Sequence, residues 1–153
     1  RRLDPARLGN QVTFAWSVEE ETGLKGAEAL AAASSFDVVF AVDTFVSSDS
    51  PLESKAFALG ILGQGPVLRA MDNSNLAPAP PLARIQDLAK SHGIPLQIGL
   101  THGGNDGSVF TSYGAVDLPL SWPTTYSHSA VESIHEDDLN KLGQLVALLA
   151  EAW

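Results

Sequence analysis

The sequence contains no cysteine. This absence excludes a disulfide-stabilised scaffold, a thiolate metal site and a cysteine nucleophile. Charged residues are also scarce, at 18% of the chain, whereas hydrophobic residues make up 44%. Intrinsic disorder requires the opposite balance, so we expect a folded globular chain. Its length of 153 residues is typical of one domain.

Positive charge is in short supply as well. The chain has 9 Lys and Arg residues against 18 Asp and Glu residues, which gives a formal net charge of −9. Phosphate backbones and anionic membrane surfaces attract cationic faces, so we expect neither nucleic acid nor membrane as a partner. The chain also lacks a long apolar run that could span a membrane. Since no hydrophobic signal region begins the sequence, we expect a cytoplasmic location.

Segments typical of strands and helices alternate along the chain. Runs rich in β-branched and aromatic residues predict strands at 11–18, 36–42, 96–100 and 115–120, with two shorter candidates within 56–71. The first of these, residues 11–18, is expected to be buried on both faces. Helices are predicted at 1–9, 27–34, 81–92, 108–113 and 137–152. The alternation predicts an α/β fold, namely a three-layer αβα sandwich with a mainly parallel sheet.

Polar side chains follow four of the predicted strands. They are the acidic run Glu19–Glu21, then Asp43, then His102 with Asp106, and finally His128. Sites in parallel sheets form at the carboxyl ends of strands, so we expect these side chains to lie along one edge. Carboxylate oxygen and imidazole nitrogen together suit Zn²⁺, Co²⁺ or Mn²⁺.

Adjacent carboxylates have a specific use in hydrolysis. Neighbouring side chains on extended backbone point to opposite sides, so one can bind a metal while the other takes a proton from water. Taken singly, each residue has an ordinary explanation: a solvated acidic loop, a turn aspartate at position 43 and a hydrogen-bonded loop histidine at position 128. Their joint placement is what suggests metal-assisted hydrolysis.

The segment Glu20–Ala27 (EETGLKGA) resembles the signature of the glutamyl-aminopeptidase/TET family of dinuclear metallo-aminopeptidases, peptidase family M42, some of whose members are named endoglucanases. Further motifs follow in the family's order and approximate spacing. They are Val42–Thr44, Asp49–Pro51, Leu62–Pro66, Asp72, Gly103–Asp106 and Tyr126–Ser129 with Glu132. The resemblance covers nearly the whole chain and implies a zinc-peptidase-like fold.

The resemblance also implies roles for individual residues. Glu20 would be the general base that activates water. Glu21 and His128 would bind one divalent metal ion and Asp43 a second, with Zn²⁺ or Co²⁺ as the expected ions. The reaction implied is removal of the N-terminal residue from peptides. Residues that could contact the substrate or support the ligands are Asp106, His102 and Glu132.

The sequence departs from the family pattern at several positions. Thr125 stands where the family usually has Arg, Asn105 replaces a Thr, Thr22 replaces a Val, and Leu52 replaces the Gly of a Pro-Gly pair. The largest departure is that the family's upstream His and metal-bridging Asp would fall before Arg1. The inserted β-rich dimerisation domain would also fall there. We therefore expect residues 1–153 to be the C-terminal portion of a catalytic domain, incomplete, with reduced or no metal occupancy and little activity alone.

Two other functions stay open from the sequence. A related co-catalytic metal hydrolase, such as a deacylase, would also use the Glu-Glu pair. A degenerate, non-catalytic family member is the other alternative, and Thr125 is its only support. Family members form large shells, so the resemblance implies that the parent protein is a homo-oligomer, with a dodecamer among the expected forms.

Overall fold

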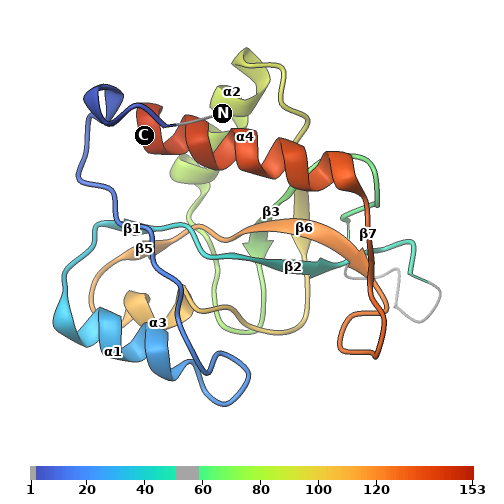
Figure 1. Ribbon diagram of the computed structural model, residues 1–153, viewed down its shortest axis with the longest axis horizontal. Coiled ribbons are helices and arrows are strands. Elements are labelled where there is room, and N and C mark those ends of the chain that lie inside the picture. The colour runs from blue at the N-terminus through green and yellow to red at the C-terminus, as the bar shows by residue number, and fades with distance from the viewer. Residues whose placement is uncertain (1–2, 51–58) are drawn as a thin grey trace.

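The computed structural model describes residues 3–50 and 59–153 of the chain (Figure 1). After a short 3₁₀ turn at Pro5–Arg7, helices are interspersed with strands, in two places with three strands in succession. The helices are α1 (Lys25–Ala33), α2 (Ala79–Ser91), α3 (Ser108–Thr111) and α4 (Glu136–Ala152). The strands are β1 (Val38–Val39), β2 (Val42–Val46), β3 (Val67–Met71), β4 (Gln97–Leu100), β5 (Val116–Asp117), β6 (Leu120–Thr125) and β7 (Ser133–Ile134).

The main sheet has the strand order β2–β6–β3–β4, and the short strand β7 pairs with β6. β2 runs parallel to β6 and β3 runs parallel to β4, whereas β6 is antiparallel to both β3 and β7. β1 and β5 form a separate parallel pair. The predicted α/β class with mainly parallel strand pairing is therefore confirmed.

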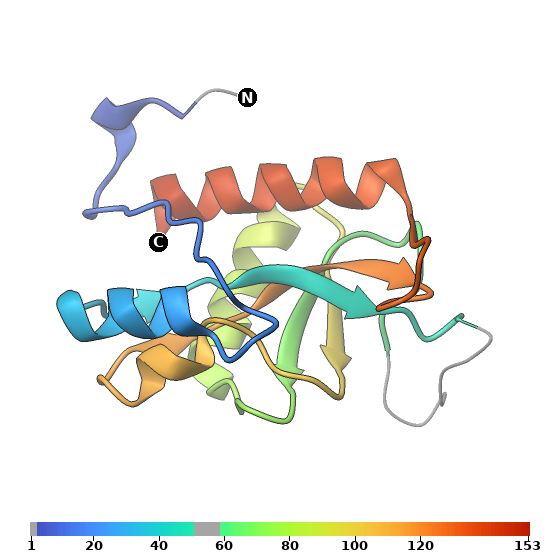
Figure 2. The same cartoon turned by 60° about the horizontal axis from the view of Figure 1, so that its bottom comes forward.

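Helices cover both sides of the strands, which gives the three layers (Figure 2). α2 and α4 lie on one side, and α1 and α3 lie on the other. The larger core fills the space beneath α2 and α4, and its most enclosed side chains come from both layers. They are Leu68, Ile85, Leu118, Leu120, Leu145 and Leu149, each at most 2% exposed. The smaller core lies under α1 and α3, where Phe36 meets Phe110 edge-to-face.

The start of α4 ties this helix to a distant glycine loop. Glu136, Asp137 and Asp138 occupy its first turn, where the helix dipole favours negative charge. Asp138 is fully buried and accepts backbone N–H bonds from Gly63 at 2.8 Å and Gly65 at 2.7 Å. One carboxylate thus accepts from two loop donors, of which the Gly65 N–H would otherwise be buried without an acceptor.

The prediction for residues 11–18 is wrong. The segment runs outside the regular elements, and its large side chains face solvent, with Trp16 87% exposed and Val18 66% exposed. A central strand must bond to backbone on both edges, and within the described ranges no strand pairs with this segment. The predicted helix at 1–9 is also wrong within its described part, which contains only the 3₁₀ turn that Asp4 caps.

Several boundaries differ from the prediction. The strand expected at 36–42 is two strands, so that Asp43 lies inside β2 rather than after a strand. The strand expected at 115–120 likewise divides into β5 and β6. Residues 59–62 are not in a strand, and the rest of that candidate, with Pro51 and Leu52, lies outside the described residues. Of the helices in residues 3–50 and 59–153, none is long and apolar enough to cross a membrane.

Candidate active site

The acidic run lies in a tight turn that leads into α1. The backbone N–H groups of Gly23 and Leu24 both bond to the carbonyl of Glu20, at 3.1 and 3.0 Å. Glu19 and Leu24 have positive φ angles of 58° and 57°, which non-glycine residues rarely adopt. Gly26 lets the first turn of α1 approach Val18, because a Cβ at this position would collide with the Val18 backbone. The glycines of this motif thus fix where the two glutamates lie.

Glu20 lies at the centre of a negatively charged group. Partial burial raises the pKa of Glu20, and the nearby carboxylates of Asp43, Glu21 and Asp106 raise it further, while His128 acts in the opposite direction. These residues come from four separate parts of the chain. The electrostatic effect of Glu21, Asp43, Asp106 and His128 on Glu20 indicates that these four residues lie near Glu20.

Glu21 and His128 form the closest pair among the predicted ligands. The His128 Nε2 atom lies 3.8 Å from Glu21 Oε1, and both side chains are about three-quarters exposed. His128 has a positive φ of 60°, and so does Tyr126 two residues earlier, at 62°. The carboxylate of Glu132 accepts the backbone N–H of His128 at 2.8 Å, which holds this loop in its conformation. Glu132 therefore supports His128 through the backbone.

Asp43 is held by neighbours on its own side of the site. Its Oδ1 accepts the Thr44 backbone N–H at 2.6 Å, and its Oδ2 accepts a bond from Arg69 at 3.0 Å. Over residues 3–50 and 59–153, no group of three His, Asp or Glu side chains is close enough to hold a metal ion. The structure therefore brings Glu21 and His128 together but does not join Asp43 to them in a ligand cluster.

Asp106 and His102 lie in loops near the sheet edge. Asp106 accepts a hydrogen bond from the Ser17 hydroxyl, which connects the loop before α3 to the segment before Glu20. Its other oxygen, Oδ1, is buried and has no hydrogen-bond partner within the described part of the chain. His102 is in the exposed loop that follows β4. A buried carboxylate oxygen without a donor is one feature of this region that a cation would satisfy.

A buried polar network that the sequence did not reveal lies behind Asp43. Arg69 bonds to Asp72 at 3.4 Å, and the Asn105 amide also donates to Asp72, at 2.9 Å. Burial alone would raise the pKa of Asp72, but donors from Ser74 and Asn105, with the Arg69 charge, lower it. Asp72 is thus a stable anion within the protein.

Asp117 in β5 behaves differently. Burial raises the pKa of Asp117 to about 7, against a smaller opposing effect of the Asn105 amide. Neither carboxylate oxygen of Asp117 has a hydrogen-bond partner of normal geometry among the described residues, and the side chain packs against Gly107. One sequence signal for the network was available: Arg69 is a lone charged residue inside an apolar strand pattern.

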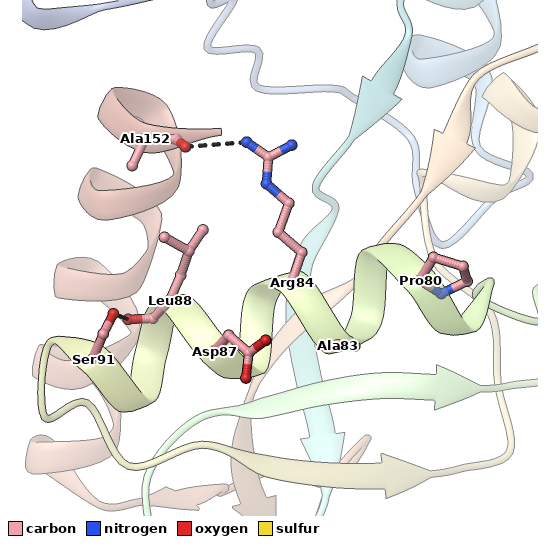
Figure 3. Close-up of a pocket in the computed structure, with 7 residues that line it drawn as sticks. All are labelled: Pro80, Ala83, Arg84, Asp87, Leu88, Ser91 and Ala152. Atoms are coloured by element: carbon pink, nitrogen blue, oxygen red, sulfur yellow. Dashed lines mark hydrogen bonds between the residues drawn. The ribbon is translucent and has the colours of Figure 1, made fainter.

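A shallow hollow on the surface lies away from these residues (Figure 3). It has a volume of about 610 Å³ and lies along α2 beside the end of α4. Arg84 projects across it, bonds to the Ala152 carbonyl at 3.2 Å and stacks over the Trp153 ring at 4.3 Å. None of the predicted site residues lines this hollow. It contributes nothing to the proposed chemistry.

Comparison with known proteins shows a peptidase family. Residues 1–145 match the profile of the M42 glutamyl aminopeptidases, and the chain belongs to that family. The chain is 33% identical over 149 residues to a protein of Acetivibrio thermocellus named putative aminopeptidase. The aligned region covers 95% of this chain and 44% of that protein. The resemblance stated from the motifs is therefore confirmed.

Solved structures agree with this assignment. The fold is similar to that of one chain in the structure of PhTET1-12s, which is described as a dodecamer. The TM-score is 0.82, and the match has 39% identity and covers 90% of this chain and 40% of that one. It is also similar to the Pyrococcus horikoshii TET1 peptidase, described as assembling into a tetrahedron or a large octahedral shell, with a TM-score of 0.78 and 39% identity. That match covers 87% of this chain and 38% of the other. The chain thus spans well under half the length of these relatives.

Proposed function

We propose that this chain forms part of a metal-dependent aminopeptidase that removes the N-terminal residue from peptides. Membership of the M42 family and the similarity to aminopeptidases support the reaction class. The observation that carries the proposal is the environment of Glu20. It is the one partly buried carboxylate of the acidic run, and burial together with the carboxylates of its neighbours raises its pKa, which strengthens it as a base.

In this mechanism Glu20 acts as general base and then as general acid. It takes a proton from the water that attacks the scissile carbonyl carbon. When the C–N bond breaks, Glu20 delivers that proton to the leaving amine. Partial burial and the acidic neighbours raise the pKa of Glu20 and so make it a stronger base, whereas His128 acts in the opposite direction.

The donor set fits divalent metal ions by chemistry. Glu21 and His128 would hold one ion, and Asp43 would hold the second, with Zn²⁺ or Co²⁺ as suitable ions. Ions bound there would supply a Lewis acid that polarises the substrate carbonyl. The 3.8 Å separation of Glu21 and His128 supports the first assignment, and the half-buried position of Asp43 near the start of β2, where solvent still reaches it, supports the second.

We further propose that residues 1–153 supply only some of the ligands of the metal site. The matched relatives are more than twice as long as the aligned region. We expect the further ligands implied by the family resemblance, a His and a bridging Asp, to be supplied outside residues 1–153. The chain alone would then bind metal weakly, because an isolated pair of ligands gives little affinity. Relatives that form dodecamers and shells support a homo-oligomer as the working form.

Hydrolysis of an aminoacyl-anilide by the intact protein tests the proposal. The wild type should release the aniline after metal is added, and Glu20→Gln should lose at least a hundredfold in kcat while it still binds Co²⁺. Asp87→Asn, an exposed change on α2, serves as the matched acid-to-amide control and should retain activity. Turnover by Glu20→Gln at the wild-type rate would contradict the assigned base, and cleavage of N-acyl amino acids instead would favour a deacylase.

A further inference from the structure

Arg69 is the most enclosed cation near the candidate site. It lies in the middle of β3, and its side chain is only 4% exposed although it carries a full charge. A buried guanidinium is stable only when its donors are satisfied and its charge is balanced. Neighbouring oxygen atoms accept from its donors, and the carboxylates of Asp43 and Asp72 balance its charge.

Every arm of the guanidinium has a partner. Nε donates to the Ser121 hydroxyl at 2.9 Å, and one terminal nitrogen donates to the Gly104 carbonyl at 3.0 Å and to Asp72 at 3.4 Å. The other terminal nitrogen donates to the Thr44 carbonyl and, at 3.0 Å, to Asp43 Oδ2. The five acceptors come from β2, β6 and two loops. Arg69 therefore fixes the relative positions of three strands and the two loops behind the site.

We propose that Arg69 is a positioning residue that orients the Asp43 carboxylate for metal binding. Asp43 and Ser121 lie directly opposite each other in the β2–β6 pairing, and the guanidinium bonds to both side chains. The Thr44 backbone holds the other Asp43 oxygen, so the carboxylate cannot rotate freely. This inference rests on the proposed role of Asp43 as a metal ligand.

The planar guanidinium group of Arg69, with several N–H donors in fixed directions, is the property that would orient Asp43. Ligating carboxylates are oriented by hydrogen bonds from outside the metal shell, and loss of such a partner weakens metal affinity by about 10- to 100-fold. Lysine would keep the positive charge but could not reach Asp43, Ser121 and Gly104 at once. Arg69→Lys therefore separates orientation from charge, since only orientation is lost.

Co²⁺ titration of the intact protein, followed by calorimetry and by the visible absorption of bound cobalt, tests this role. We expect Arg69→Lys to raise the Kd for Co²⁺ by about tenfold or more and to change the absorption bands. Ser121→Ala, which removes only the Nε acceptor, should shift both readouts in the same direction by less. Arg84→Lys on α2 is the matched control and should leave both unchanged, because Arg84 bonds to Ala152 and stacks on Trp153 at the end of the chain rather than contacting Asp43.

The outcomes are distinct. If folded Arg69→Lys binds Co²⁺ with the wild-type Kd and spectrum, the inference is wrong although the proposed function stands. If the wild-type intact protein binds no Co²⁺, the ligand assignment itself fails and the inference fails with it. Circular dichroism establishes whether Arg69→Lys is folded, and if it is not, Ser121→Ala decides: an unchanged Kd there overturns the inference.

Discussion

Asp117→Asn should remove a pH-dependent loss of stability. Asp117 is 1% exposed, and burial raises the pKa of its carboxyl from 3.8 to about 7 in the folded chain. The unfolded chain exposes the same group to water, where its pKa is ordinary. The folded state therefore binds the proton more tightly than the unfolded state does, and stability falls as the pH rises from the unfolded pKa to the folded pKa.

The size of this effect follows from the two pKa values. A tenfold difference in proton affinity is worth about 1.4 kcal/mol, so the difference between 3.8 and about 7 corresponds to about 4 kcal/mol at full ionisation. Roughly 2–3 kcal/mol of this should be lost between pH 5 and pH 8, since part of the loss has already occurred at pH 5. A domain with a total stability of about 5–15 kcal/mol would register this clearly.

Urea unfolding of the wild type and Asp117→Asn at pH 5 and pH 8 measures the effect. Asn has the shape of Asp but no charge. The free energy of unfolding of Asp117→Asn should therefore change between the two pH values by about 2–3 kcal/mol less than that of the wild type. Comparing the two proteins cancels the titration of the histidines, which both contain. Asp87→Asn, at an exposed position on α2, controls for the loss of one negative charge and should follow the wild type.

Parallel pH profiles for the wild type and Asp117→Asn would refute the reasoning. That result would mean that Asp117 is ionised in the folded chain at neutral pH, with Arg69 or the Asn105 amide as its compensating partner. The structure predicts the opposite, because Arg69 is already bonded to Asp43 and Asp72.

Three further predictions follow from single contacts. Glu20→Gln should flatten the acidic limb of the kcat pH profile in whatever residual activity the intact protein retains, because that limb would report the pKa of the base. Gly107→Ala should destabilise the chain by about 1–3 kcal/mol in urea unfolding, since the new Cβ would overlap the Asp117 carboxylate, and equal stability would show that this packing relaxes freely. Asp138→Ala should cost about 2–4 kcal/mol, because one buried and one partly buried backbone N–H group lose their acceptor, and amide exchange of the glycine loop should accelerate.

The sequence predicted the helices better than the strands. α2 and α4 lie within one or two residues of their predicted limits, because a helix satisfies its own backbone and its apolar stripe is visible locally. The segment 11–18 has a strand's composition, but a strand depends on partners that composition does not specify. β7 was missed for the same reason, since its two residues are defined only by pairing with β6.

The residues of the candidate site also differ in whether local sequence reveals them. Glu20, Glu21 and His128 could be proposed from the sequence because their chemistry and order along the chain resemble the family pattern, and in the structure these three residues lie near one another. Arg69 and Asp117 were not predictable, because their roles arise from burial against groups that are distant in the sequence. A charged residue within an apolar strand pattern is the local signal that such a network exists, although it does not identify the partners.

Among the described residues, the pKa is raised for two carboxyl groups, Asp117 and Glu20, and the burial of each decides whether it can act as a base. Asp117 is almost fully enclosed, so that no water or substrate can reach it without local unfolding. A general base must lie within hydrogen-bond reach of the proton that it abstracts. Glu20 meets this requirement because it is only partly buried and because acidic neighbours contribute to its shift alongside burial. Ionisation of Asp117 would therefore change stability, whereas ionisation of Glu20 would change reactivity, and the two can be separated by measuring unfolding and turnover over the same pH range.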